Sequence, residues 1–130
     1  MSRRTASWPA GSKEIMNLNE LLERKIDLTK QGQVVEAAEL FFAENAETDD
    51  FIGVQTNGRD EMVRKMQDFT SGIQNVNGIT YHNSAVNGNT TYAEFTFDFD
   101  MKDGSKVLWH EIIRSVWKDG KIVKEQYFKA

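Results

Sequence analysis

Three glycine-containing dipeptides in the second half of the chain constrain its fold more than any other feature. Asn87-Gly88, Asp103-Gly104 and Asp119-Gly120 each separate two segments in which apolar and polar residues alternate. Asn-Gly and Asp-Gly favour the tight turns of β-hairpins, because these residues tolerate a positive φ. Three such turns in succession predict a meander of four antiparallel strands from about residue 79 to the C-terminus.

Two of the predicted strands differ in the character of their faces. In residues 91–101 one face is apolar and the other is largely charged, and the apolar face carries Ala93, Phe95, Phe97 and Phe99. This pattern predicts that the phenylalanine row packs on helices. In residues 106–117 both faces are apolar, which a sheet covered by helices on one side does not require. We therefore expect the second face of this strand to contact another copy of the chain.

Helical periodicity precedes the meander. Apolar residues at three- and four-residue spacing predict helices near residues 18–31, 34–42 and 59–71, with Gly32 and Gly72 ending the first and the third. A short strand is expected between the second and third helices. The predicted fold class is α+β, with a curved, mainly antiparallel sheet wrapped around a long N-terminal helix. Residues 1–15 are expected to form a flexible arm.

Composition excludes several classes of protein. The formal net charge of -4 provides no basic surface for nucleic acid or for an anionic membrane. The absence of cysteine excludes disulfides, thiolate metal sites and cysteine nucleophiles, and it fits the cytoplasmic location that we expect. No apolar run approaches the roughly 18 residues of a membrane span. His82 and His110 lack metal-ligand spacing, and the sequence has no phosphate-cradling glycine loop, so neither a metal nor a cofactor is expected.

Two segments, residues 41–69 and 115–128, resemble a known family. In the first, Asp50 follows a strand and Gly58-Arg59-Asp60 opens a helix, while the second contains Asp119-Gly120-Lys121-Ile122 and closes on Tyr127-Phe128. This order resembles the cone-shaped fold shared by nuclear transport factor 2, the SnoaL-like polyketide cyclases, ketosteroid isomerase and limonene epoxide hydrolase. The resemblance implies a SnoaL-like cone domain over residues 16–130 with an apolar pocket.

The resemblance places Asp50 where ketosteroid isomerase keeps its proton-transferring aspartate. Beside Phe51, desolvation would raise the pKa of this carboxyl and allow it to shuttle protons. The alternative is an ordinary solvated acid at the end of a strand. The isomerase also requires a tyrosine and a protonated aspartate at two further positions. Lys25 and Ile112 fall near these positions, which argues against a steroid isomerase.

The remaining candidate residues lie on the predicted sheet and helices. His110 is either a satisfied core histidine or a second acid–base candidate. The predicted ligand pocket consists of Phe41, Met66, Phe69, Phe95, Phe97, Ile112, Arg114 and Tyr127. The predicted dimer contact consists of Trp109, Ile113 and Trp117, and Glu111 on the same row is expected in a subunit contact or a salt bridge.

Two functions remain open from the sequence. The first is a SnoaL-like pocket enzyme that performs cofactor-free proton transfer on a small apolar carbonyl compound, by isomerisation, aldol cyclisation or dehydration. Asp50 or His110 would then act as the base. The second is a non-catalytic module, a homodimer that binds a small apolar ligand in the pocket or a protein partner on the sheet.

Overall fold

The computed structural model describes residues 17–130, so the arm predicted for residues 1–15 lies outside the described residues. Its helices are α1 (Leu18–Lys30), α2 (Val34–Phe41) and α3 (Arg59–Ser71). Its strands are β1 (Phe42–Asp49), β2 (Gln55–Asn57), β3 (Ile73–Asn87), β4 (Thr90–Met101), β5 (Lys106–Lys118) and β6 (Lys121–Lys129). The predicted α+β class is confirmed.

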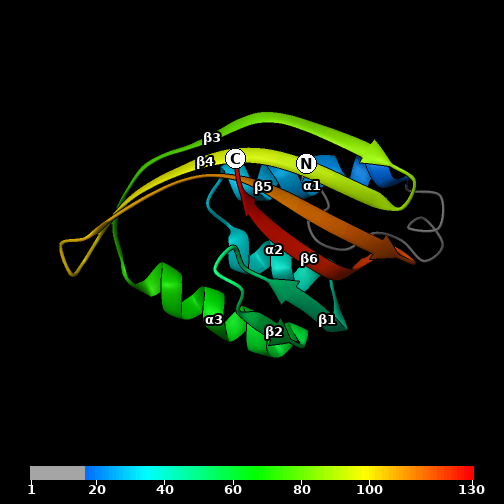
Figure 1. The fold of residues 1–130 in the computed structure, drawn as a ribbon, viewed down its shortest axis with the longest axis horizontal. Helices are drawn as coiled ribbons and strands as arrows, with labels where there is room; N and C mark the ends of the chain where they lie inside the picture. The colour runs from blue at the N-terminus through cyan, green and yellow to red at the C-terminus, as the bar shows by residue number, and fades with distance from the viewer. Residues whose placement is uncertain (1–16) are drawn as a thin grey trace, which may run out of the picture.

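The strands form one curved, mixed sheet in the order β2-β1-β6-β5-β4-β3. Strands β3 to β6 are the predicted antiparallel meander, and β1 pairs in parallel with β6 and antiparallel with β2. The three-residue strand β2 was not predicted, because so short a segment carries no periodicity. Figure 1 shows β3, β4 and β5 arching over α1 and α2, with α3 on the opposite side of the molecule from the arch.

Local sequence signals set the ends of these elements. Asn17 caps α1, since its side chain accepts from the backbone N–H of Glu20 and the Glu20 carboxyl accepts from the backbone N–H of Asn17. Asp119 and Gly120 have φ values of 53° and 79°, as a two-residue hairpin turn requires. Register shifts interrupt the β3–β4 ladder at three places, and such bulges bend a long strand.

The core has two parts, both on the concave face of the sheet. The phenylalanine row of β4 is buried as predicted, and it packs with Leu22 and Ile26 of α1. The second part joins α2, β1 and the ends of β5 and β6, where the rings of Phe41 and Trp117 meet edge to face at 5.7 Å. These contacts hold the sheet against α1 and α2.

The structure corrects the predicted orientation of β5. Its inner row, which faces the helices, is Trp109, Glu111, Ile113, Ser115 and Trp117, and its outer row is Leu108, His110, Ile112, Arg114 and Val116. Ile113 and Trp117 are only 6% and 4% exposed within one protomer. The prediction that Trp109, Ile113 and Trp117 form a dimer contact is therefore wrong, because these side chains lie inside the protomer.

Within residues 17–130, no helix has both the length and the apolar composition that crossing a membrane demands.

Candidate functional site

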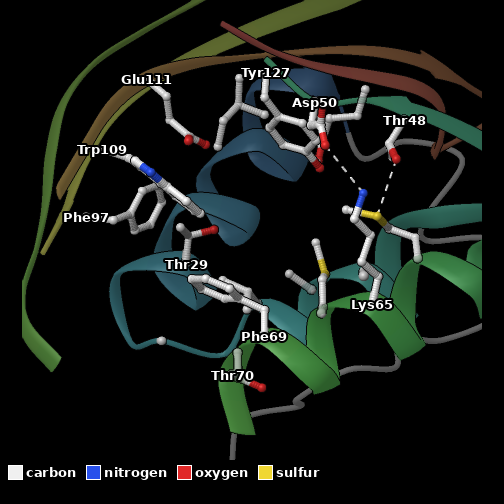
Figure 2. Close-up of a pocket in the computed structure, with 18 of the residues that line it drawn as sticks. Thr29, Thr48, Asp50, Lys65, Phe69, Thr70, Phe97, Trp109, Glu111 and Tyr127 are labelled. Atoms are coloured by element: carbon white, nitrogen blue, oxygen red, sulfur yellow. Dashed lines mark hydrogen bonds and ion pairs between the residues drawn. The ribbon is translucent and has the colours of Figure 1, made fainter. Parts of the chain in front are cut away.

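A cavity of about 490 Å³ lies between the concave face of the sheet and the helices (Figure 2). This volume falls in the range of small-molecule sites. Its walls are mainly apolar, and seven of the lining side chains are aromatic: Phe42, Phe51, Phe69, Phe97, Phe99, Trp109 and Tyr127. Ile52 and Val76 also line the cavity and are 78% and 52% exposed, so they mark its opening.

Five charged side chains line the cavity: Lys25, Asp50, Lys65, Glu111 and Glu125. Four of them form two pairs, with Lys25 Nζ 3.1 Å from Glu125 Oε2 and Lys65 Nζ 3.6 Å from Asp50 Oδ2. The side chain of Glu111 forms no hydrogen bond or ion pair with any residue of the described part of the chain. One carboxyl is therefore left without a partner in the wall of the cavity.

Glu125 is held by three groups. Besides the ammonium of Lys25, the hydroxyl of Ser115 donates to Glu125 Oε2 at 2.6 Å, and the hydroxyl of Tyr127 donates to Oε1 at 2.6 Å. Glu125 is 2% exposed, and this set of donors compensates the loss of water around its carboxylate. Burial raises the pKa of Tyr127 well above its ordinary value, and the neighbouring charge of Glu125 adds to the effect.

Glu111 lies on β5 between Trp109 and Ile113 and is 6% exposed. Figure 2 shows its carboxyl directed into the cavity, close to Trp109 and Phe97. Burial raises the pKa of Glu111, the charge of Glu125 raises it further and the charge of Lys25 lowers it, with a net value of about 7. Both protonation states of Glu111 are therefore populated at neutral pH, so the group can take up a proton and return it.

The pKa of Asp50 shifts in the opposite direction to that of Glu111. Its Oδ1 accepts hydrogen bonds from the backbone N–H groups of Ile52 and Val54 at 3.0 and 2.8 Å. Burial acts to raise the pKa of Asp50, but these hydrogen bonds and the charge of Lys65 outweigh it and the pKa is lowered. Asp50 does line the cavity, but the expected rise in its pKa is wrong, and the carboxyl instead holds the turn at residues 50–54.

The predicted pocket residues divide by their position relative to the cavity. Four of the eight line it: Met66, Phe69, Phe97 and Tyr127. Phe41 and Phe95 are buried in the core instead, each 1% exposed, and they do not line the cavity. The buried phenylalanines predicted to face a ligand thus serve partly to hold the sheet on the helices.

Three candidates lie on the outer face of the sheet and not in the pocket. Ile112 and Arg114 belong to the outer row of β5, where the guanidinium of Arg114 donates to Gln126 Oε1 at 2.7 Å. His110 is also outside, with its Nε2 2.6 Å from Glu94 Oε2. The predicted pocket positions of Ile112 and Arg114 are wrong, and His110 is neither a core histidine nor a group that faces the cavity, because the pleat of β5 directs all three away from the helices.

Sequence reasoning missed Glu111, Lys25 and Glu125 as site residues. A signal was present for two of them, because Glu111 alternates with Trp109 and Ile113, and Lys25 falls within the apolar stripe of the first helix. A charged residue in an otherwise apolar row is seldom buried without a reason. Among residues 17–130, no cluster of three or more His, Cys, Asp or Glu could hold a metal ion.

Comparison with known proteins identifies relatives of this chain. The family model of the SnoaL-like domain matches residues 16–129. A protein from Mesorhizobium loti, named for its likeness to SnoaL-like polyketide cyclases, is 26% identical, with a TM-score of 0.79 over 87% of this chain and 99% of the other.

Two more distant structures show the same fold. One is a nuclear transport factor 2-like protein from Burkholderia pseudomallei, 10% identical, with a TM-score of 0.72 over 88% of this chain and 92% of its own. The other, from Xanthomonas campestris and named for polyketide cyclases, is 14% identical, with a TM-score of 0.69 over 86% and 89%. No curated protein matches the chain in sequence.

Proposed function

The chain belongs to the SnoaL-like domain family, and from that membership and the geometry of the cavity we propose that it is a pocket enzyme for cofactor-free proton transfer. Its substrate is a small, largely apolar carbonyl compound. The observation that carries the proposal is the unpartnered carboxyl of Glu111, buried in the wall of an apolar cavity with a pKa of about 7. Glu111 thus takes the role that the sequence suggested for Asp50 or His110.

The chemistry begins with the ionised form of Glu111. Its carboxylate removes a proton from the carbon next to the carbonyl, and the electron pair of the broken C–H bond moves onto the carbonyl oxygen to form an enolate. Lys25 faces the same cavity, and its ammonium has further N–H donors besides the one directed at Glu125. These donors stabilise the enolate oxygen.

The second step depends on where the enolate reacts. Where the substrate carries a C=C bond next to the deprotonated carbon, the enolate extends over that bond, and Glu111 can return the proton to its far carbon, which shifts the double bond and gives an isomerisation. The enolate carbon can instead attack a second carbonyl of the same molecule, and Glu111 then protonates the new alkoxide, which gives an aldol cyclisation. Both outcomes need one group that takes up and returns a proton near neutral pH, and a carboxyl with a pKa near 7 meets that requirement.

The experiment is hydrogen–deuterium exchange of small cyclic ketones in D₂O, with 2-tetralone as the first probe, followed by NMR. The wild type should accelerate exchange, and the rate should rise with pH to a plateau above about pH 7, because the ionised carboxyl is the base. Glu111→Gln should lower the rate at least about a hundredfold, the usual contribution of a general base.

The matched control is Asp50→Asn, which removes the charge of another acid that lines the cavity, one that is paired with Lys65. This variant should retain most of the exchange activity, because the lowered pKa of Asp50 leaves it a weak base. Full activity in Glu111→Gln, or no acceleration over buffer across the ketone panel, would contradict the proposal.

A second candidate function is self-association through the outer face of the sheet. Leu108 and Phe128 are 63% and 46% exposed, and Ile112 lies directly across from Phe128 on the same face. His110 lies between Leu108 and Ile112, and the apolar side chains on either side of it provide surface that a second copy would cover. We propose that the outer face of the sheet at Leu108, Ile112 and Phe128 pairs with the same face of a second copy about a two-fold axis.

A further inference from the structure

The charges that line the cavity do not balance. The pairs Lys25–Glu125 and Lys65–Asp50 each neutralise themselves, so the ionised form of Glu111 adds one uncompensated negative charge. Lys129 lies opposite Glu111 on β6, but it is exposed and its ammonium lies over the Phe51 ring, 5.1 Å from the centroid. No cation among residues 17–130 pairs with Glu111.

Aromatic rings surround the space into which Glu111 points. The ring of Trp109 stacks on Phe69 at 5.3 Å with an interplanar angle of 20°, and the ring of Phe51 meets Trp109 edge to face at 5.5 Å. Figure 2 shows Phe97 and Tyr127 completing this aromatic wall around the carboxyl. The faces of aromatic rings attract cations, and the attraction grows as water is removed.

We propose that the cavity binds a small lipophilic ammonium ion, with its positive charge beside the Glu111 carboxylate and its apolar body against the aromatic wall of Trp109, Phe69, Phe97 and Tyr127. The inference goes beyond the proposed function, because it requires only that Glu111 be ionised and accessible from the cavity. An ammonium bound in this way occupies the place of the carbonyl substrate, so it also acts as a competitive inhibitor of the proposed reaction.

The structure favours an organic cation over an inorganic one. A metal ion needs several oxygen ligands, whereas this wall offers a single unpartnered carboxyl surrounded by carbon. An alkylated ammonium carries its own apolar surface, and burying that surface in a cavity of about 490 Å³ is favourable. The charge and the shape of the cavity therefore select the same class of ligand.

Binding should depend on pH through Glu111, because only its ionised form pairs with the ligand. The charged groups around it are Lys25 on α1, Glu125, Tyr127 and Lys129 on β6, and the Asp50–Lys65 pair, while its β4 neighbours Phe95 and Phe97 carry none. The pKa of Glu111 is about 7. The affinity for a permanent cation should therefore fall by about tenfold from pH 8 to pH 6, as ligand binding displaces the proton.

The test uses two ligands of the same shape. Benzyltrimethylammonium carries a permanent positive charge, and neopentylbenzene replaces its nitrogen with an uncharged carbon. At pH 8, calorimetry or ligand-observed NMR should show the cation binding at least about tenfold more tightly, as the combined ion pair and ring contacts imply. Equal affinities of the two ligands for the wild type would overturn the inference.

Two further measurements locate the charge that is recognised. Glu111→Gln should abolish the dependence on pH and most of the preference for the cation, whereas His110→Gln, on the outer face of the same strand, should keep both. Calorimetry of the wild type at pH 7 in two buffers of different ionisation enthalpy should show about half a proton released per cation bound. An undiminished preference in Glu111→Gln, or binding without proton release at pH 7, would also overturn the inference.

Failure of this inference is distinguishable from failure of the proposed function. If the cation binds with the expected pH dependence and no ketone exchanges hydrogen, the catalytic proposal fails and the ligand class stands. If ketone exchange depends on Glu111 and the cation binds no better than its isostere, the ligand class fails and the catalytic proposal stands.

Discussion

Two adjacent residues of β5, His110 and Glu111, show how far the two faces of this sheet differ. On the outer face, His110 is exposed and its Nε2 lies 2.6 Å from Glu94 Oε2, so it has a hydrogen-bond partner at the surface. On the inner face, Glu111 is 6% exposed and has no partner in the described chain. Burial without a partner raises the pKa of Glu111 to about 7, and this pKa, more than the residue type, suits it to proton transfer near neutral pH.

The largest expected difference between the two faces is in the cost of truncating two neighbouring isoleucines. Ile113→Ala removes a side chain that is 6% exposed and packed in the core, and it should lower the free energy of unfolding by about 2–5 kcal/mol. Ile112→Ala, on the outer face, should cost under about 1 kcal/mol in the monomer. Urea denaturation of both variants at low protein concentration measures the difference, and equal costs would contradict the assigned orientation of β5.

The second prediction concerns the dependence of stability on pH. The pKa of Glu111 rises from 4.5 to about 7 on folding, so the folded state binds the proton more tightly than the unfolded state. The contribution of Glu111 to the free energy of unfolding is therefore fully present below about pH 4.5. It is lost as the pH rises through about 7, by about 3 kcal/mol in total. Glu111→Gln should remove this fall, as urea denaturation between pH 5 and pH 8 would show.

The control for the pH prediction is Asp50→Asn. The pKa of Asp50 is lowered in the folded state, so its contribution to stability is present above its ordinary pKa of 3.8 and is lost as the pH falls below it. Asp50→Asn should therefore leave the fall between pH 5 and pH 8 intact. A wild-type protein whose stability is flat over that range would show that Glu111 is not the buried acid described above.

The fold was largely predictable from the sequence because turn chemistry and periodicity act locally. Asn87-Gly88, Asp103-Gly104 and Asp119-Gly120 place the three hairpins, and the spacing of Met62, Val63, Met66 and Phe69 predicts α3 over the residues that it occupies. Helix α2 ends one residue earlier than predicted, because Phe42 begins β1. The parallel pairing of β1 with β6 joins segments that are far apart in the sequence, so no local sequence signal predicts it.

The candidate site was less predictable because it depends on the register of a single hairpin. A two-residue turn at Asp103-Gly104 would pair Phe97 with His110 and place His110 on the inner face. In the structure Asp100 pairs with Lys106, so the connection is one residue longer and Phe97 lies opposite Trp109. A shift of one residue exchanges the two faces of a strand. That shift moved His110, Ile112 and Arg114 outward and brought Glu111 into the cavity.

The third prediction tests whether a second copy covers the outer face of the sheet at Leu108, Ile112 and Phe128. Leu108→Lys places a charge in the row formed by Leu108, Ile112 and Phe128, and it should weaken dimerisation by at least about tenfold, or 1.4 kcal/mol. Sedimentation equilibrium measures the effect. Val76→Lys is the matched control, because Val76 is 52% exposed but lies at the opening of the cavity. A wild type that remains monomeric at high concentration would disprove the dimer.

The smallest expected effect is that of His110→Gln, the outer counterpart of Glu111→Gln. The pair of His110 with Glu94 lies at the surface, with side chains 48% and 32% exposed, and such pairs contribute under about 1 kcal/mol. The His82 ring lies 5.0 Å away on the same face, and the sheet separates both rings from the cavity. Ketone exchange by His110→Gln should therefore stay within about twofold of the wild type, since the group touches neither substrate nor cavity. The NMR assay used for Glu111→Gln measures this rate, and a loss as large as that of Glu111→Gln would return the acid–base role to the outer face.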